Sequence, residues 1–389
     1  MTTRRYGQHR AQQPMHLLFP FELVAHIATY LADDTGTLLA CSITCRLWSN
    51  ATRPQIFRDV TISSPHRLQA LCDLIKGTPS IGSWIKKIIF AISRPRPCRD
   101  LLPTNWLIKT GEILRGLEKN LTRLRSIAFD SVEVGGDPAD CTSFFEVLAN
   151  FRTIRHVRVY ECLLTVTSFC NFLCKLPLLE SVSLEAPSPI SLEGLVQGTG
   201  LIKISSLTLV FEWNQTKTRT WFTSAITAAS LRNLVVDILE ESYVGVTNRL
   251  LELTGPYLQT LDIMLPRYHE SNAQSPSRLA IMEGINLRHN TVLRDITFYN
   301  PNAPEYIPIL DQLSSPNLRR VFIMLTFSTL EEIKDYKDLD KRLGQQDFKH
   351  VEEVCVRYLS DSEMSVVSGE IHRVFSSVSA RGILQVQKI

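Results

Sequence analysis

Cysteine and histidine are the side chains of this chain best suited to nucleophilic or metal chemistry, so their spacing gives the first test for a reactive site. The 389-residue sequence holds nine cysteines, with no C-x-x-C pair, and nine isolated histidines. Cys41 and Cys45, and likewise Cys170 and Cys174, stand four apart, which would place each pair on one helix face. No second pair follows at the distance a zinc finger needs, so we expect no metal, no cofactor and reduced, packed thiols.

Motifs for phosphate and nucleotide binding are incomplete. Gly77 and Gly82 are spaced like the ends of a phosphate loop, but the Lys and the Ser or Thr that should follow Gly82 are missing. Gly198-Thr-Gly200 opens like a dinucleotide-binding turn, yet Lys203 replaces its third glycine. Both segments are therefore predicted to be turns.

Acidic and histidine side chains give no catalytic set either. Asp335, Asp338 and Asp340 lack the glycine and the final glutamate of a calcium loop, so they predict the solvated start of a helix. The chain has neither a nucleophile elbow nor an H-E-x-x-H helix. His156 is the only histidine on a predicted exposed strand face. There it could either contact a ligand or be ordinary solvent-exposed surface. We predict a binding protein without catalytic residues.

Length and composition limit the elements that could position such binding residues. A chain of 389 residues exceeds one compact core, which predicts two units or an elongated repeat array. With 44% hydrophobic and 21% charged residues and a formal charge of +3, nothing calls for nucleic acid or a membrane. Pro20, Glu22 and His26 interrupt the apolar stretch that would otherwise imitate a signal peptide. We expect a soluble protein of the cytoplasm, the nucleus or both, with residues 1–14 as a disordered leader.

Residues 15–56 predict a module of three short helices. The first begins at Pro20, and its apolar residues are spaced four apart, at Leu23, Ile27 and Leu31. The second is predicted over residues 38–43 with Thr37 as its cap, and the third is predicted to end before Pro54. So small a unit cannot bury all of its apolar residues, which indicates a partner surface.

The order of residues in this module resembles the F-box. The resemblance lies in Phe19-Pro20-x-Glu22-Leu23, then Leu38-Leu39, and then Thr44-Cys45-Arg46-x-Trp48. Phe19 and Thr44 replace the usual Leu and Val of that family, and about two extra residues fall between Asp33 and Thr37. The alternative reading is a three-helix cap that seals one end of a repeat array.

The F-box resemblance implies a docking module that inserts into the Skp adaptor of cullin-RING ubiquitin ligases and presents the rest of the chain as a substrate receptor. It implies that the adaptor is bound by Leu18, Phe19, Pro20, Glu22, Leu23, Ile27, Leu31, Leu38, Leu39, Cys45 and Trp48.

The rest of the chain, residues 57–389, repeats one short pattern, in which an apolar residue is followed by a second three places on and a third two places after that. The copies start at residues 57, 85, 124, 154, 179, 204, 231, 258, 293, 318 and 351. Alternation at the end of each copy predicts a strand, and helix-like segments lie between the copies. This α/β pattern resembles an irregular leucine-rich repeat solenoid of about ten or eleven units. Only Cys162 stands where such repeats usually carry Asn or Cys.

The variable residues beside the buried strand positions are predicted to line the concave face and to contact a protein substrate. Aromatic and Arg side chains are frequent interface anchors, so the first candidates are His156, Arg158, Tyr160, Tyr299, Arg320 and Phe322. Charges on this face are mixed, so no class of substrate is predicted. The alternative function is a stand-alone leucine-rich interaction scaffold.

Overall fold

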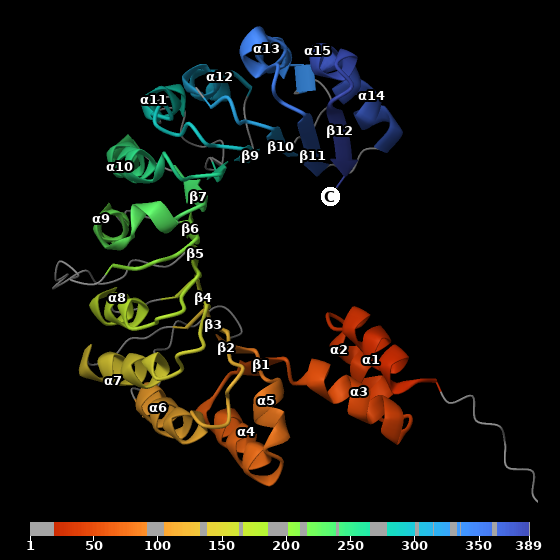
Figure 1. The fold of residues 1–389 in the computed structure, drawn as a ribbon, viewed down its shortest axis with the longest axis vertical. Coiled ribbons are helices and arrows are strands. Elements are labelled where there is room, and N and C mark those ends of the chain that lie inside the picture. The colour runs from red at the N-terminus through yellow and green to blue at the C-terminus, as the bar shows by residue number, and fades with distance from the viewer. Residues whose placement is uncertain are drawn as a thin grey trace, which may run out of the picture. The chain divides into compact units, whose positions relative to one another are not determined.

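The computed structural model describes most of the chain after the first eighteen residues (Figure 1). The described ranges are 19–91, 105–132, 138–162, 166–185, 201–210, 216–238, 241–264, 278–299, 303–313, 315–326, 333–334, 336–359 and 364–388. The chain divides into two compact units between Asp59 and Val60, close to the boundary predicted after residue 56. The predicted leader and Leu18 lie outside the described residues.

The first unit consists of three helices, α1 (Phe21–Tyr30), α2 (Thr35–Ser42) and α3 (Arg46–Ile56). Its buried core holds only small and medium-sized side chains, namely Val24, Ala28, Leu38 and Ala51. Partly buried residues surround this core, namely Ala25, Leu31, Leu47, Trp48 and Ile56. Three helices were predicted here, and three are present.

Two predicted helix ends in this unit are wrong. Asp34, and not Thr37, caps α2: its carboxylate accepts hydrogen bonds from the Thr37 backbone N–H at 2.9 Å and the Thr37 hydroxyl at 2.6 Å. The helix therefore starts at Thr35. Helix α3 continues through Pro54, because a proline so near the end removes a single backbone hydrogen bond and Phe57 N–H still donates to Arg53 O at 3.0 Å.

The second unit is built on a sheet whose strands follow chain order and pair in parallel. The strands are β1 (Asp59–Ile62), β2 (Lys87–Ala91), β3 (Ser126–Asp130), β4 (His156–Tyr160), β5 (Ser181–Glu185), β6 (Ser206–Val210), β7 (Asn233–Asp237), β8 (Thr260–Met264), β9 (Asp295–Tyr299), β10 (Arg320–Thr326), β11 (Glu353–Leu359) and β12 (Leu384–Lys388). Each of the first eleven begins two residues after the start of a predicted copy, so the strand prediction is confirmed.

Helices occupy most of the segments between the strands. The α-helices are α4 (Pro65–Gly77), α5 (Ser80–Trp84), α6 (Asn105–Leu117), α7 (Pro138–Ala149), α8 (Val166–Cys174), α9 (Thr216–Ala225), α10 (Val244–Thr254), α11 (Arg278–Gly284), α12 (Ala303–Gln312), α13 (Lys337–Leu343), α14 (Met364–Val374) and α15 (Ser376–Ala380). Short 3-10 turns are η1 (Ala228–Ser230), η2 (Glu241–Tyr243) and η4 (Gln346–Phe348). A strand and a helix per repeat make this unit an α/β solenoid.

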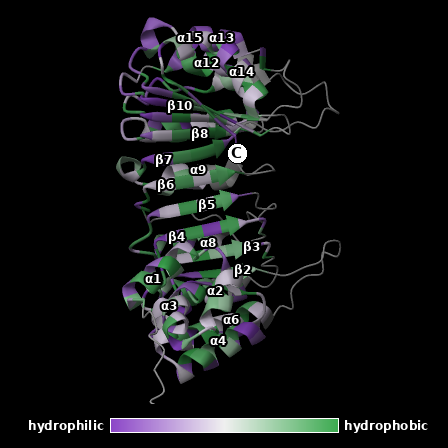
Figure 2. Ribbon diagram, turned by 90° about the vertical axis from the view of Figure 1, so that its right-hand side faces the viewer, coloured by the Kyte–Doolittle hydropathy of each residue, from purple (hydrophilic) through white to green (hydrophobic). Residues whose placement is uncertain are grey.

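The helices of the second unit pack on one face of its sheet, and none of its described helices covers the other, which we call the open face (Figure 1). On β4, for example, Val157 and Val159 are buried, whereas His156 and Arg158 are exposed. Neighbouring arrows point the same way in Figure 2, so the first residues of all strands share one edge of the sheet. We call it the amino-terminal edge.

Aromatic side chains dominate the core between the sheet and its helices in the first repeats. The Phe90 ring stacks on Phe129 at 5.5 Å between centroids and meets Phe144 edge-on at 5.8 Å. Phe144 contacts Phe145 at 5.5 Å, and Phe145 stacks on Phe172 at 5.3 Å. These five buried rings run from β2 to α8, so each repeat packs on its neighbour and no repeat has a core of its own.

The last strand, β12, escaped the repeat pattern because Arg381 stands where the other copies begin with an apolar residue: Val354 pairs with Leu384, which aligns Val351 with Arg381. The Arg381 guanidinium donates to the carbonyl oxygens of Leu343 and Phe348, both at 3.0 Å, and of Val351 at 3.1 Å. It ties the final turn to the preceding repeat.

Asp340 was predicted to be solvated, and this prediction is wrong. Its side chain is 4% exposed, and its carboxylate accepts hydrogen bonds from the backbone N–H groups of Ser377 and Val378, both at 3.0 Å. These amides belong to the first turn of α15, which has no carbonyl partners for them within the helix. Asp340 therefore joins α13 to α15.

Where strands β3 and β4 end, nearby side chains form hydrogen bonds with the backbone N–H and C=O groups. Cys162 is buried, and its thiol donates to Tyr160 O at 3.0 Å while its sulfur accepts from Val132 N–H at 3.3 Å. Burial raises the pKa of the Cys162 thiol to about 12, so it remains a neutral donor. Ser131 and Glu161, which directly follow β3 and β4, adopt positive φ angles of 54° and 48°.

Candidate functional site

The first unit leaves large apolar side chains on its surface. On α1, Leu23 and Tyr30 are 43% and 79% exposed, and Ile27 between them is half-buried, so the spacing places all three on one side of the helix. Leu39 and Ile43, four residues apart on α2 and its carboxyl end, are 51% and 86% exposed. Phe19 and Phe21 at the start of α1 are also exposed. We call these seven residues the apolar docking set.

Several residues predicted to touch the adaptor instead serve the core of the first unit. Leu38 is fully buried, and Leu31 and Trp48 pack against the same core. The Leu38 side chain is therefore not on the surface of the free unit, which corrects its place among the predicted contacts. Leu31 and Trp48 have a structural role as well as partial exposure.

Three other residues of the predicted adaptor surface lie where the helices begin. Pro20 and Glu22 are exposed, and Pro20 O accepts from the N–H groups of Leu23 and Val24, which starts α1. Cys45 is exposed at the start of α3, and the Trp48 backbone N–H lowers the pKa of its thiol by favouring the charged form.

On the open face of the second unit, three of the candidate residues lie on β4. Arg158 donates to the Glu185 carboxylate of β5 at 2.6 Å, and its guanidinium lies 5.7 Å from the centre of the Tyr160 ring. The Ser183 hydroxyl donates to the other Glu185 oxygen at 2.6 Å. His156 is exposed at the start of the strand. The charge of Arg158 in this group is therefore paired with that of Glu185.

The other three candidates lie on β9 and β10, five strands away. The Arg320 guanidinium makes two hydrogen bonds to the Asp295 carboxylate, each 2.7 Å, and lies 5.7 Å from the centre of the Phe322 ring. Arg357 of β11 approaches the same ring to 5.2 Å. The structure thus brings Arg320 and Phe322 together, beside Tyr299, and separates them from the β4 group.

Asp262 on β8 is an unusual feature of this second group. Burial raises the pKa of its carboxyl, against the hydrogen bonds that Thr297 and Tyr299 donate to it. One of its oxygens has no hydrogen-bond partner. Burial and the nearby Asp262 charge raise the pKa of the Tyr299 hydroxyl. The sequence placed both residues on this face, but it did not reveal that they interact.

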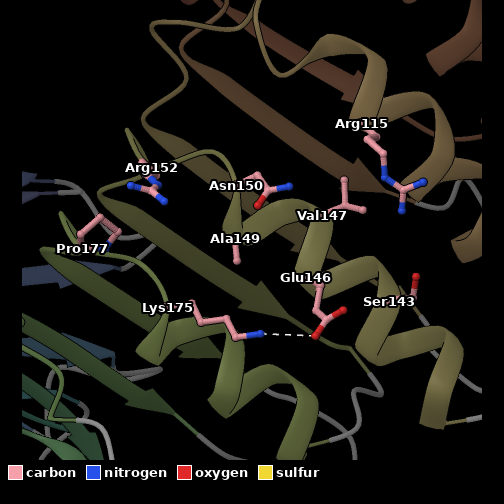
Figure 3. A pocket seen from close by; sticks show the side chains of 9 residues that line it. All are labelled: Arg115, Ser143, Glu146, Val147, Ala149, Asn150, Arg152, Lys175 and Pro177. Atoms are coloured by element: carbon pink, nitrogen blue, oxygen red, sulfur yellow. Dashed lines mark hydrogen bonds and ion pairs between the residues drawn. The ribbon is translucent and has the colours of Figure 1, made fainter.

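Sequence reasoning missed two depressions on the amino-terminal side of the repeats. The larger, about 640 Å³, lies between α6, α7 and the turn after α8 (Figure 3). Lys175 points toward Glu146 across it, with 3.4 Å between the charged atoms, and Arg115 and Arg152 also line it. The smaller, about 350 Å³, is lined by Lys86, Thr122, Arg123, Arg125, Thr153, Arg155 and Leu178.

The sequence carries the basic residues of the smaller depression at a repeated position, but the same position is also basic at Arg58, Arg232, Arg294 and Arg319. The residue directly after the first apolar position of a copy is basic at Lys86, Arg125 and Arg155.

Among the residues that the structure describes, no group of three or more His, Cys, Asp or Glu side chains could hold a metal ion. In the same part of the chain, no helix is both long and apolar enough to cross a membrane. No protein-family model matches the chain, and neither does any curated protein. The F-box resemblance therefore rests on the residues that carry it.

Proposed function

We propose that this protein is a substrate receptor of a Skp-cullin-F-box ubiquitin ligase, acting in the cytoplasm, the nucleus or both. Its first unit docks on the Skp adaptor, and its second unit, a degenerate leucine-rich repeat array, recruits a protein to be ubiquitinated. No catalytic residue is assigned, because the ligase chemistry belongs to other subunits.

The apolar docking set is the observation that carries this proposal. A three-helix unit whose large apolar side chains remain exposed gains stability when a partner covers them, at about 25 cal/mol per Å² of apolar surface removed from water. Leu23 and Leu39 lie in this set, at positions that also carry the F-box resemblance. Exposure and sequence order thus favour the same docking surface.

Co-purification of the full chain with a Skp adaptor tests the proposal. Wild type should retain the adaptor, and Leu23→Asp and Leu39→Asp should each lower retention at least about tenfold, because a buried carboxylate without a partner costs more than 1.4 kcal/mol. Leu74→Asp on α4 is the matched control, since Leu74 has 42% exposure against 43% for Leu23 and lies in the second unit.

Two results of this assay would contradict the proposal. One is a wild-type chain that does not retain the adaptor where an established F-box protein does. The other is an equal loss with Leu74→Asp, which would assign the effect to solubility. Trp48→Ala is less informative, because Trp48 packs on the core of the first unit and its removal also affects folding.

A further inference from the structure

The smaller depression, which we call the amino-edge pocket, is built by the turns that lead into β2, β3 and β4. The backbone fixes its floor: Arg125 N–H donates to Lys86 O at 2.8 Å, and Arg155 N–H donates to Arg125 O at 2.7 Å. These bonds extend the sheet ladder by one residue, so three basic side chains from successive repeats stand side by side. Arg123 joins them from the turn before β3.

The charges in this pocket are not balanced. Four basic residues and no carboxylate line it. Arg155 is paired with Glu180, but Lys86, Arg123 and Arg125 are exposed and form no ion pair with any described residue. One residue further along the strands, Lys87 of β2 and His156 of β4 both pair with Ser126 of β3 and lie on either side of it. Like charges held this close repel one another, and an anion seated among them would relieve that repulsion.

We propose that the amino-edge pocket binds a phosphate monoester carried by a protein segment. A phosphorylated side chain has a charge of about −1.5 to −2 and three acceptor oxygens, so it can use several cations at once, whereas one arginine satisfies a carboxylate. Arg123 and Arg125 supply planar donor forks of the kind suited to phosphate. The Thr122 hydroxyl adds a polar group, and Leu178, 46% exposed, offers an apolar contact to the segment.

Nucleic acid fits the same surface less well. None of the residues that line the pocket is aromatic, so no base could stack there. The opposite edge of the same strands carries Asp130 at the end of β3, Glu161 directly after β4 and Glu185 at the end of β5. A long polyanion laid across the open face would meet these carboxylates. The positive region is therefore restricted to one edge and suits a local anion.

This inference deepens the proposed function, on which it rests for the protein nature of the ligand: it gives the recruited protein a phosphorylated side chain. The test measures binding of the full chain to a fluorescent degenerate peptide library with one central phosphoserine. The same library with serine, and with glutamate, at that position gives the comparison. A 20-nucleotide single-stranded DNA serves as competitor.

We expect the phosphoserine library to bind at least about tenfold more tightly than either comparison library. Arg123→Gln and Arg125→Gln should each reduce this affinity about tenfold, and 10 mM inorganic phosphate should compete. Arg294→Gln is the matched control: Arg294 is exposed and follows the first apolar residue of its own copy, far from the pocket in sequence. The Arg294→Gln variant should bind the phosphoserine library as tightly as wild type does.

Equal binding of the phosphoserine and glutamate libraries would overturn the inference, as would an equal loss with Arg294→Gln. Tighter binding of the DNA than of the phosphopeptides, lost in Arg123→Gln, would assign the pocket to nucleic acid instead. Adaptor retention, measured on the same variants, separates the two proposals. Loss of the adaptor with intact phosphopeptide binding contradicts only the ligase assignment, and the reverse result contradicts only the pocket.

Discussion

The two units of this protein differ in how completely they bury their own apolar side chains. Fourteen large apolar residues are exposed in the described part of the chain, and six of them lie between Phe19 and Ile43. The second unit, several times longer, buries rows of strand residues and ten of its largest side chains almost completely. The first unit therefore exposes more large apolar side chains for its length than the second unit does, which is consistent with the docking role proposed for it.

The largest effect on stability should come from the aromatic core of the solenoid. Phe144→Ala removes a buried ring that contacts Phe90, Phe129 and Phe145, and we expect it to destabilise the second unit by about 3–5 kcal/mol. Chemical denaturation of the full chain measures this loss, with the exposed neighbour Ser143→Ala as control. A loss below about 1 kcal/mol would show that the repeats do not share one core.

A somewhat smaller effect is expected at the carboxyl end of the solenoid. Asp340→Ala leaves the backbone N–H groups of Ser377 and Val378 without their acceptor. We expect a loss of about 1–3 kcal/mol from the buried Val378 donor and little from Ser377, which is exposed and can bind water. Asp338→Ala on the same helix should change the free energy of unfolding by less than about 0.5 kcal/mol, because Asp338 is exposed. Equal effects of the two substitutions would contradict the role given to Asp340.

Removal of residues 1–55 should change the stability of the solenoid little and abolish adaptor retention. Each unit has a buried core of its own, so we expect the core of the second unit to persist without the first. If these helices instead cap the array, the shortened chain would melt several degrees lower, since a missing cap exposes the end of a solenoid. Thermal melting of the shortened and full chains decides between the two.

A smaller, pH-dependent effect is expected from Asp262 on the open face. Its pKa is raised in the folded state, so the folded chain holds this proton more tightly than the unfolded chain does. Stability from this group is fully present below the ordinary pKa of 3.8 and is lost as the pH rises through the raised value. Asp262→Asn should therefore equal or exceed wild type in stability at pH 7 and lose that advantage at about pH 3.5. An advantage that grows toward low pH would contradict the shift.

Much of the fold followed from the sequence because the buried strand positions are apolar in every copy from Phe57 to Val351. Two of the failures share one cause, which is that a polar residue took a structural position. Arg381 replaced the first apolar residue of the last copy and hid β12. Asp340 was wrongly predicted to be solvated because the backbone N–H groups that donate to its carboxylate belong to Ser377 and Val378, which lie 37 and 38 residues further along the chain.

The candidate surfaces were less predictable than the fold. Order along the chain could place Leu23, Leu38 and Leu39 together, but only the packing of three helices decides that Leu38 is buried and the other two are exposed. A basic residue also follows the first apolar position in other copies, at Arg232 and Arg294, so this pattern alone did not identify the amino-edge pocket. It was missed because the significance of Lys86, Arg125 and Arg155 depends on the in-register stacking of separate repeats.

Hydrogen–deuterium exchange of the full chain, with and without a Skp adaptor, tests the central contrast between the two units most directly. We expect the adaptor to slow amide exchange in α1 and α2, which carry most of the apolar docking set, and to leave strands β2 to β12 unchanged. Unchanged exchange in α1 and α2, or new protection confined to the strands, would contradict the assignment of the first unit as the docking surface.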